Sequence, residues 1–297
     1  MKTITTNPDI VKLYNYKNIQ EEDFLKIKND FEQVRIPCVD NFLEEEDLNF
    51  LKTNLKYEGI NQDDVIRPGE KGYKAWRRKY KKLKNHCFLK RLNKKSRASV
   101  EERVKQIDSK VFSLMDKMGY KIVSHVKVFR NTLTENEDLH FDIFNPPPKN
   151  TGLIRVFINL DDDYRVWRNS LNIYEYTELN LEAIKKLVQK QNIKIHLRKH
   201  GGEYKRFNHF LSTEVLDSPM GENCDSVFEG EIALPKIETK FAPGCAWVCD
   251  SIQSSHQIYY GKRCLNYDFR VDADSYIWAG NIYSNRIKPT IKRLNEK

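Results

Sequence analysis

The sequence lacks long apolar runs. No stretch within its 297 residues reaches the ~18 consecutive apolar side chains that a membrane-spanning helix needs. The N-terminal segment, MKTITTNPDIVKLYNYKN, also lacks the apolar core of a secretory signal. These absences argue against an integral membrane protein and predict a soluble, cytoplasmic one. Peripheral contact with the inner leaflet of the inner membrane stays open.

Cysteine patterning is absent too. The six cysteines form no C-x-x-C pair, show no zinc spacing with histidine, and are too scattered for a disulfide framework. We therefore expect free thiols in a reducing compartment. The six are Cys38, Cys87, Cys224, Cys245, Cys249 and Cys264.

The chain shows no internal repeat, no low-complexity segment and no clear linker. We therefore predict one domain over residues 1–297. Within it, residues 1–98 would form an N-terminal extension with a basic segment. Residues 99–297 would form a helix followed by a β-rich core.

Positive charge is concentrated rather than spread. The formal net charge is +9, and between residues 74 and 97 half the side chains are Lys or Arg and none is acidic. Such a run favours an anionic partner, although a solvated loop without a partner is the plainer alternative. Aromatic side chains lie among the charges, but no recognised nucleic-acid motif accompanies them, so we expect no nucleic acid.

The chain contains one His-x-Asp motif, formed by His140 and Asp142. On an extended segment, side chains two residues apart leave the same face, so both can bind one metal ion. A second imidazole would complete the facial triad that holds Fe(II) and leaves positions open for a co-substrate and dioxygen. A surface pair without metal is the alternative.

His256 is the best-placed histidine to complete this triad. It follows the buried segment 245–250 and precedes a turn, YYGKR, and a further strand, LNYDFRV. His125 lies on a predicted strand, where a packing role is commoner. The remaining downstream histidines share no spacing with the motif; they are His196, His200 and His209.

Strands predominate after residue 120, and they are mostly joined by turns rather than by alternating helices. This favours an antiparallel barrel over a doubly wound sheet. We predict an α+β fold, a double-stranded β-helix (jelly roll, cupin-like) with flanking N-terminal helices at 43–55 and 99–118. Ser99 and Glu102 would cap the second helix, and Gly119 would end it.

Iron of this type commonly works with 2-oxoglutarate, whose distal carboxylate needs a cation, and arginine suits a carboxylate best. Arg155 ranks first, because it lies on the strand just after the motif and shares a strand face with Asn159. We expect Asn159 to contact the co-substrate as well. Arg130, which ends the preceding strand, ranks second, and Arg270, on the strand after His256, ranks third. A salt bridge at the rim is the alternative for each arginine.

The motif segment, LHFDIFNPPPKNTGLIRVFINLDDDYRVWR, resembles the Kdo hydroxylase family. In that family a His-x-Asp start, a Pro-containing loop, Arg-Val-Phe-x-Asn and Arg-Val-Trp-Arg follow in this order. The segment FAPGCAWVCDSIQSSHQIYYGKRCLNYDFRV is similar to the family's Pro-Gly-x-x-Trp followed by Asp, Ser-His and Gly. The likeness covers about Val126 to Val271.

This resemblance implies an Fe(II)/2-oxoglutarate-dependent dioxygenase with iron bound by His140, Asp142 and His256. The implied substrate is an anionic glycolipid, because the family adds a 3-hydroxyl to Kdo (3-deoxy-D-manno-oct-2-ulosonic acid) in the lipid A inner core of lipopolysaccharide. Arg165 and Arg168 match the family signature, and we expect them to contact the sugar.

Two alternatives remain at this stage. The same chemistry could act on a nucleic acid or on a protein side chain, with the basic segment binding that substrate. Otherwise the chain could be a non-catalytic jelly-roll binding module. The sequence predicts no oligomeric state.

Overall fold

The computed structural model describes residues 10–54, 94–131, 139–142, 150–190, 237–261 and 263–295. The basic run from 74 to 93 and the three histidines between 191 and 236 lie outside these ranges, so their predicted roles stay predictions. Among the described residues, no helix is long and apolar enough to cross a bilayer.

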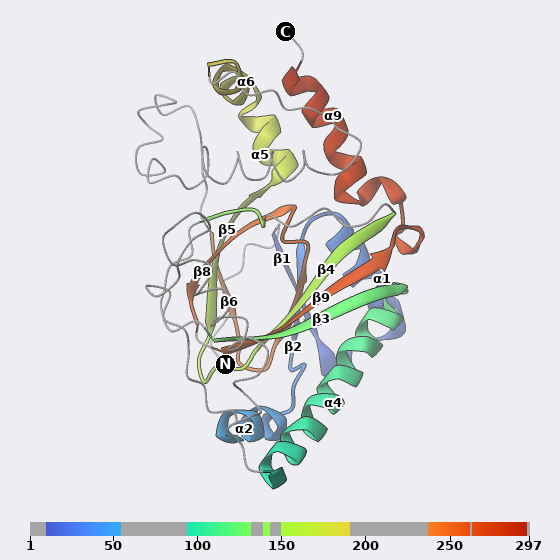
Figure 1. The fold of residues 1–297 in the computed structure, drawn as a ribbon, viewed down its shortest axis with the longest axis vertical. Coiled ribbons are helices and arrows are strands. Elements are labelled where there is room, and N and C mark those ends of the chain that lie inside the picture. Colours follow the sequence, from blue (N-terminus) through green and yellow to red (C-terminus); the bar gives the residue numbers. More distant parts are fainter. Residues whose placement is uncertain are drawn as a thin grey trace.

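Two sheets form the centre of the molecule (Figure 1). The larger has the strand order β1-β2-β7-β4-β9-β3, and the smaller has the order β6-β5-β8. Every pair is antiparallel except β1 with β2. The strands of the larger sheet are β1 (Val11–Asn15), β2 (Ile36–Asp40), β7 (Ala246–Cys249), β4 (Thr151–Asn159), β9 (Arg263–Asp272) and β3 (Ile122–Asn131). Those of the smaller sheet are β6 (Ile237–Phe241), β5 (Arg165–Asn172) and β8 (Ser254–Tyr260).

An aromatic cluster fills the space between the sheets. Phe157 and Trp247 come from the larger sheet and Trp167 from the smaller one, and their ring centroids lie 5.1 to 5.4 Å apart. Side chains alternate along a strand, so odd-numbered positions on β4, β5 and β7 face this interior. On β9 the interior positions are the even-numbered ones, because Asn266 is paired with Phe157.

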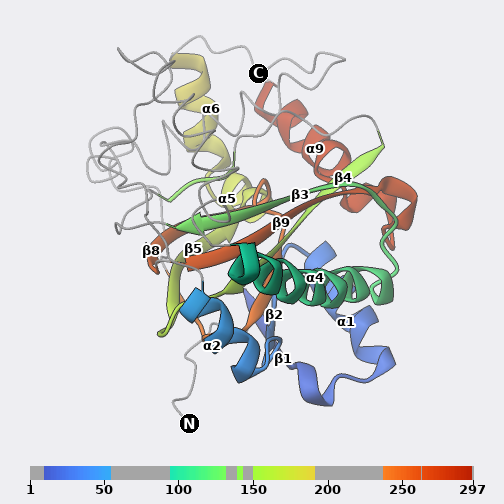
Figure 2. The ribbon, with the colours of Figure 1, turned by 60° about the horizontal axis from the view of Figure 1, so that its bottom comes forward.

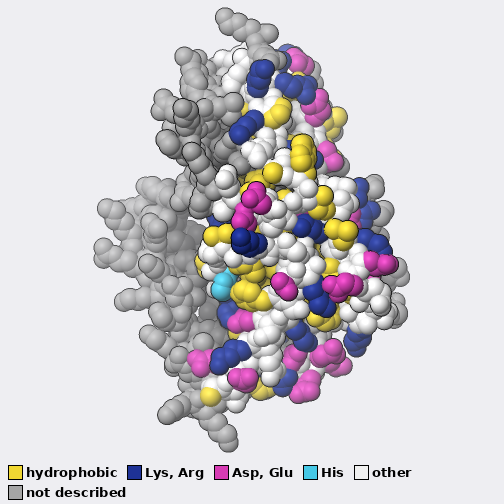
Figure 3. Space-filling view, turned by 90° about the vertical axis from the view of Figure 1, so that its right-hand side faces the viewer, with side chains coloured by type: hydrophobic (Ala, Val, Ile, Leu, Met, Phe, Trp, Pro, Cys, Tyr) yellow, Lys and Arg dark blue, Asp and Glu magenta, His cyan; other side chains and the backbone are white. Residues whose placement is uncertain are grey.

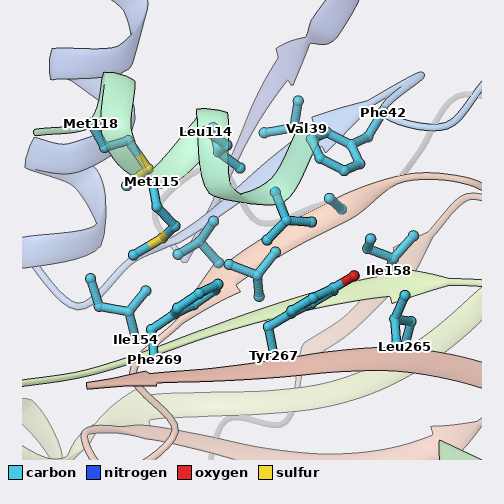
Figure 4. Packing of buried hydrophobic residues seen from close by; sticks show 14 of the residues in the cluster. Val39, Phe42, Leu114, Met115, Met118, Ile154, Ile158, Leu265, Tyr267 and Phe269 are labelled. Carbon is cyan, nitrogen blue, oxygen red and sulfur yellow. The ribbon is translucent and has the colours of Figure 1, made fainter. Parts of the chain in front are cut away.

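Helices cover the opposite face of the larger sheet (Figures 2 and 4). They are α1 (Glu21–Glu32), α2 (Glu45–Asn54) and α4 (Lys94–Lys117). Figure 4 shows Leu114 and Met115 of α4 packed over Ile154 of β4 and Phe269 of β9. The predicted mixed fold with flanking N-terminal helices is therefore confirmed at the level of α+β.

The predicted cap of α4 is wrong. The helix begins at Lys94, so Ser99 lies inside it rather than at its start. The predicted end is confirmed, because Gly119 adopts φ +70°, the left-handed conformation that commonly closes a helix. The apolar stripe of α4 is buried as its spacing predicted; it comprises Val104, Ile107, Val111, Leu114 and Met118.

A second group of helices gathers at one end of the sheets (Figure 1). It comprises α5 (Ile173–Leu179), α6 (Leu181–Lys190) and α9 (Tyr283–Asn295). Their buried residues form one cluster with Leu139 and Phe141. This cluster holds the segment that carries the His-x-Asp motif, because both apolar neighbours of His140 are fully buried in it.

Candidate metal centre

His140, Asp142 and His256 converge although they lie far apart in the chain. Their ligand atoms all lie within 4.8 Å of one another. Asp142 Oδ1 is 3.6 Å from His140 Nε2, and its Oδ2 is 3.7 Å from His256 Nε2. The predicted proximity is thus present in the structure, and among the described residues this is the one such group of His, Cys, Asp and Glu.

Backbone hydrogen bonds bring the two histidines together. His140 N donates to His256 O over 3.0 Å, and His256 N donates to His140 O over 2.9 Å. Asp142 N in turn donates to Ser251 O over 2.8 Å. The motif segment therefore pairs with the edge of β8, so that both imidazoles stand side by side, with ring centroids 4.5 Å apart.

The orientation of His256 suits a metal ligand. Its Nδ1 lies 3.1 Å from Ser254 O, and a carbonyl can only accept, so this contact assigns the proton to Nδ1. The Nε2 lone pair then faces Asp142 and His140. Trp167 stacks on the ring with a centroid distance of 5.1 Å, which fixes the plane of the imidazole.

Arg155 sits against the carboxylate of the centre. It is 2% exposed, its Nη1 donates to Asp142 Oδ2, and its Nε lies 2.8 Å from Asp268 Oδ1. Burial by itself would raise the pKa of Asp142, but the charge of Arg155 and the two imidazoles hold that pKa well below its ordinary value. Asp142 is therefore an anion, as a metal ligand must be.

A neighbouring buried carboxyl behaves differently. Asp250 accepts hydrogen bonds from Gln253 and from the Ile252 backbone. Burial nevertheless raises its pKa to about 6. Arginine contact thus distinguishes Asp142 from Asp250.

Two side chains with predicted ligand-binding roles make contacts within the protein. Asn159, expected to bind the co-substrate, donates to Asp163 O and Phe241 O and accepts from Asp161 N, so its amide holds a turn instead. Arg168 was expected to bind sugar. Because side chains alternate along a strand, its side chain lies on the outer face of β5, opposite to that of Trp167. There it binds Glu238, with donor–acceptor distances of 3.0 and 3.1 Å.

Two other predicted arginines are placed in the interior. Arg165, on β5, is 1% exposed, and its Nε and Nη1 have no hydrogen-bond partner among the described residues. Arg270, on β9, is half-buried, and its Nη1 also lacks a partner there. Burial lowers the pKa of Arg270. The side chain of Arg130 lies outside the described part of the structure, so its predicted role is untested.

Sequence reasoning missed the support of Arg155. Asn266 Nδ2 donates to Asp268 Oδ1 over 2.8 Å, which holds the carboxylate that faces Arg155. A signal was available, because Asn266, Asp268 and Arg270 alternate with apolar residues on a strand. That pattern predicts one polar face and one apolar face.

The residues fit a divalent iron. The donor set of two imidazoles and one carboxylate is the one typical of non-haem Fe(II) oxygenases. In addition, the indole N–H groups of Trp167 and Trp247, and Nε and Nη1 of Arg165, are buried in the interior and find no acceptor within the part of the chain that the structure describes. Unpaired buried donors are costly, and a small dianion such as 2-oxoglutarate would supply acceptors for them.

Comparison with known proteins gives the family. A family model described as 3-deoxy-D-manno-oct-2-ulosonic acid (Kdo) hydroxylase matches residues 33–280. The chain belongs to the Kdo hydroxylase family. The predicted family and the prediction of a hydroxylating enzyme are therefore confirmed. No curated protein matches the chain.

Solved structures of the Kdo hydroxylase KdoO, described as a non-haem Fe(II) α-ketoglutarate-dependent dioxygenase, share the fold. The apo form is 16% identical with a TM-score of 0.55, covering 95% of this chain and 96% of that one. A complex with α-ketoglutarate and Fe(III) is 15% identical, with the same TM-score and coverage. The cofactors predicted for this family member agree with those bound in its structural neighbours.

Proposed function

We propose that this Kdo hydroxylase family member is an Fe(II)- and 2-oxoglutarate-dependent dioxygenase that hydroxylates Kdo in the lipid A inner core. His140, Asp142 and His256 would hold the iron. The observation that carries the proposal is the convergence of these three side chains, with Asp142 kept anionic by Arg155. Bound iron, with 2-oxoglutarate and dioxygen, supplies the oxidising power to replace a C–H hydrogen by hydroxyl.

We infer that the two sheets form a jelly roll. The chain alternates between them: β3 and β4 belong to the larger sheet, whereas the motif segment between them pairs with β8 of the smaller one. Later in the chain, β7, β8 and β9 alternate in the same way. This alternation and the shared interior support a double-stranded β-helix.

Arg165 is the better of the two interior arginines for the distal carboxylate of 2-oxoglutarate. It lies four residues along β5 from Asn169, the strand partner of His256. The Cα atoms of Arg165 and Asn169 are therefore ~13 Å apart along the strand. An arginine and an extended dicarboxylate can together span this separation. Its full burial excludes it from contact with a large glycolipid but suits an enclosed co-substrate. Arg155, ranked first from the sequence, already binds two carboxylates.

Arg270 is better suited to the substrate. It lies on β9 at the level of Leu153, beyond the Arg155–Asp268 pair, and it is only half-buried. A partly exposed guanidinium with an unpaired N–H can bind the carboxylate of a sugar acid such as Kdo. The roles predicted for Arg165 and Arg270 are therefore exchanged in this proposal.

Contact with a membrane surface belongs to the same proposal, because lipid A is a membrane lipid. Figure 3 shows Lys and Arg, Asp and Glu, and apolar side chains interspersed on one face of the described part, without a large field of one sign. The sequence concentrates basic side chains in residues 74–97, so we expect the attraction to anionic lipid to come from that segment.

The activity test combines succinate formation with mass spectrometry of Kdo-lipid A. We expect succinate only with Fe(II) and 2-oxoglutarate, a gain of one oxygen on Kdo, and loss of both in His140→Ala. His125→Ala is the matched control, because His125 packs its ring against Phe112 at 4.9 Å on the outer face of β3. Succinate without oxidised Kdo would indicate a different substrate. Succinate that persists in His140→Ala would refute the ligand assignment.

The arginine assignments are tested by separating the two Michaelis constants. Arg165→Gln should raise KM for 2-oxoglutarate by about tenfold to a hundredfold, the usual loss for a charged hydrogen bond. Arg270→Gln should raise KM for the glycolipid by a similar factor and leave that for 2-oxoglutarate nearly unchanged. The reverse pattern would restore the roles that the sequence predicted for these two arginines.

A further inference from the structure

A cavity of about 410 Å³ lies beside the metal centre. Its volume falls within the range of about 300–1,000 Å³ that is typical of small-molecule sites. It is bounded by the chain entering β2, by the facing ends of β5 and β8, and by α9. The lining residues used below are Arg35, Asn169, Ser170, Glu175, Ser254 and Arg286.

The charged side chains in the lining are two arginines and one carboxylate. Arg35 is paired with Asp30 over 3.0 Å. Arg286 stacks on Tyr174, with its Cζ 4.4 Å from the ring centroid, and donates to the Glu32 backbone oxygen over 3.3 Å. No carboxylate among the described residues forms a direct ion pair with Arg286, so its guanidinium can still bind an anion at the cavity wall.

The one carboxylate in the lining is already engaged. Glu175 accepts from the backbone of Asn172 over 3.2 Å, as part of the cap of α5. Glu175 keeps its negative charge, but the two arginines outnumber it in the lining, so an anionic ligand at Arg286 would meet one guanidinium more than it meets carboxylates. Attraction to an anion is expected on these grounds.

The neutral lining supplies unused hydrogen-bonding groups. Asn169 Oδ1, Ser170 Oγ and Ser254 Oγ are buried without a partner among the described residues. Each of these side chains is more than nine-tenths buried. Hydroxyl and amide groups of this kind suit a polyhydroxylated ligand, because a sugar offers both donors and acceptors.

The cavity shares a wall with the metal centre. Asn169 is the strand partner of His256, and the carbonyl of Ser254 holds His256 Nδ1. A ligand in the cavity would thus lie next to the end of the β5–β8 pair that carries His256. A glycolipid with several sugar units could reach both places.

We propose that this cavity binds an anionic sugar unit next to the Kdo that is oxidised, with Arg286 as the main contact for the anion. The inference rests on the proposed function for the identity of the substrate. The shared chemistry is a saccharide with a carboxylate or a phosphate group. A second Kdo and a phosphorylated glucosamine are the two sources of such a group.

Arg286→Gln is the informative variant, and Lys288→Gln is its control. Lys288 is an exposed residue of the same helix and loses the same charge. We expect Arg286→Gln to raise KM for the glycolipid by about tenfold or more, with kcat, KM for 2-oxoglutarate and iron affinity nearly unchanged. Lys288→Gln should change none of these values.

Binding to the metal-free protein tests the cavity without the reaction. Isothermal titration with free Kdo and, separately, with a phosphorylated glucosamine disaccharide should show that one ligand binds the native protein and binds Arg286→Gln at least tenfold more weakly. The ligand whose affinity falls in Arg286→Gln identifies the anionic group that the cavity binds. Arg35→Gln alters another wall of the cavity and should lower the affinity for the same ligand. Unchanged thermal unfolding of both variants would exclude a folding defect.

The outcomes separate the two proposals. If both ligands bind native protein and Arg286→Gln equally, or if neither binds, the cavity is not a sugar site, whatever the activity. If the ligand binds through Arg286 but no succinate is formed by native protein, the proposed function fails and the binding site stands.

Discussion

The two faces of β4 and β9 differ sharply in polarity. On the outer face, Ile154 and Phe269 pack under α4 and belong to the largest apolar cluster. On the inner face of the same strands, the buried Arg155 forms an ion pair with the partly exposed Asp268, next to Asp142. One residue of spacing separates a packing surface from a reactive one.

The two faces contribute differently to the free energy of unfolding. Buried charges cost free energy unless they are paired, and even paired ones rarely stabilise a fold more than apolar residues would. The outer face therefore supplies the stability, while the inner face keeps polar groups whose benefit lies in holding Asp142. Substitutions on the two faces should consequently affect different measurements.

The largest effect on stability should come from the outer face. Phe269→Ala removes a fully buried ring beneath α4 and should lower the free energy of unfolding by about 3–5 kcal/mol. The affinity of the remaining folded protein for Fe(II) should stay nearly unchanged. Chemical denaturation and metal titration measure the two quantities. A large loss of iron affinity at full folding would break the separation between the faces.

A smaller and opposite pattern is expected on the inner face. Asp268→Asn keeps the shape but removes the charge that faces Arg155 Nε. Loss of such an outer partner typically weakens metal binding about tenfold to a hundredfold, and thermal unfolding of the metal-free protein should change much less than in Phe269→Ala. Iron affinity equal to that of the native protein would show that Arg155 positions Asp142 without help from Asp268.

The His140–Asp142 pair and the alternation of side chains along the strands could be predicted from the sequence because both depend on local spacing, whereas His256 was chosen from its setting between two predicted strands. His140 and Asp142 are two residues apart, and parity fixes their shared face. The same rule could have separated Arg165 from Arg168, because three residues of spacing put them on opposite faces of β5. Arg165 is buried and Arg168 binds Glu238 at the outer surface.

Other features depend on contacts that spacing does not encode. Arg155 was expected to be available for a co-substrate, but Asp268, remote in sequence, occupies its Nε. Asn159 was expected in the same role, but Phe241 O and the turn after β4 occupy its amide. Strand β1 and helix α1 were not predicted as separate elements, because residues 1–35 show only weak periodicity.

The backbone bridge between His140 and His256 has a consequence for assembly. Two hydrogen bonds join these chain regions directly. Closing the long loop between them during folding costs chain entropy. A metal ion bound to both imidazoles acts as a cross-link that forms only in the native state. Bound iron would therefore stabilise the closed arrangement that the backbone pairing already forms, in addition to its chemical role.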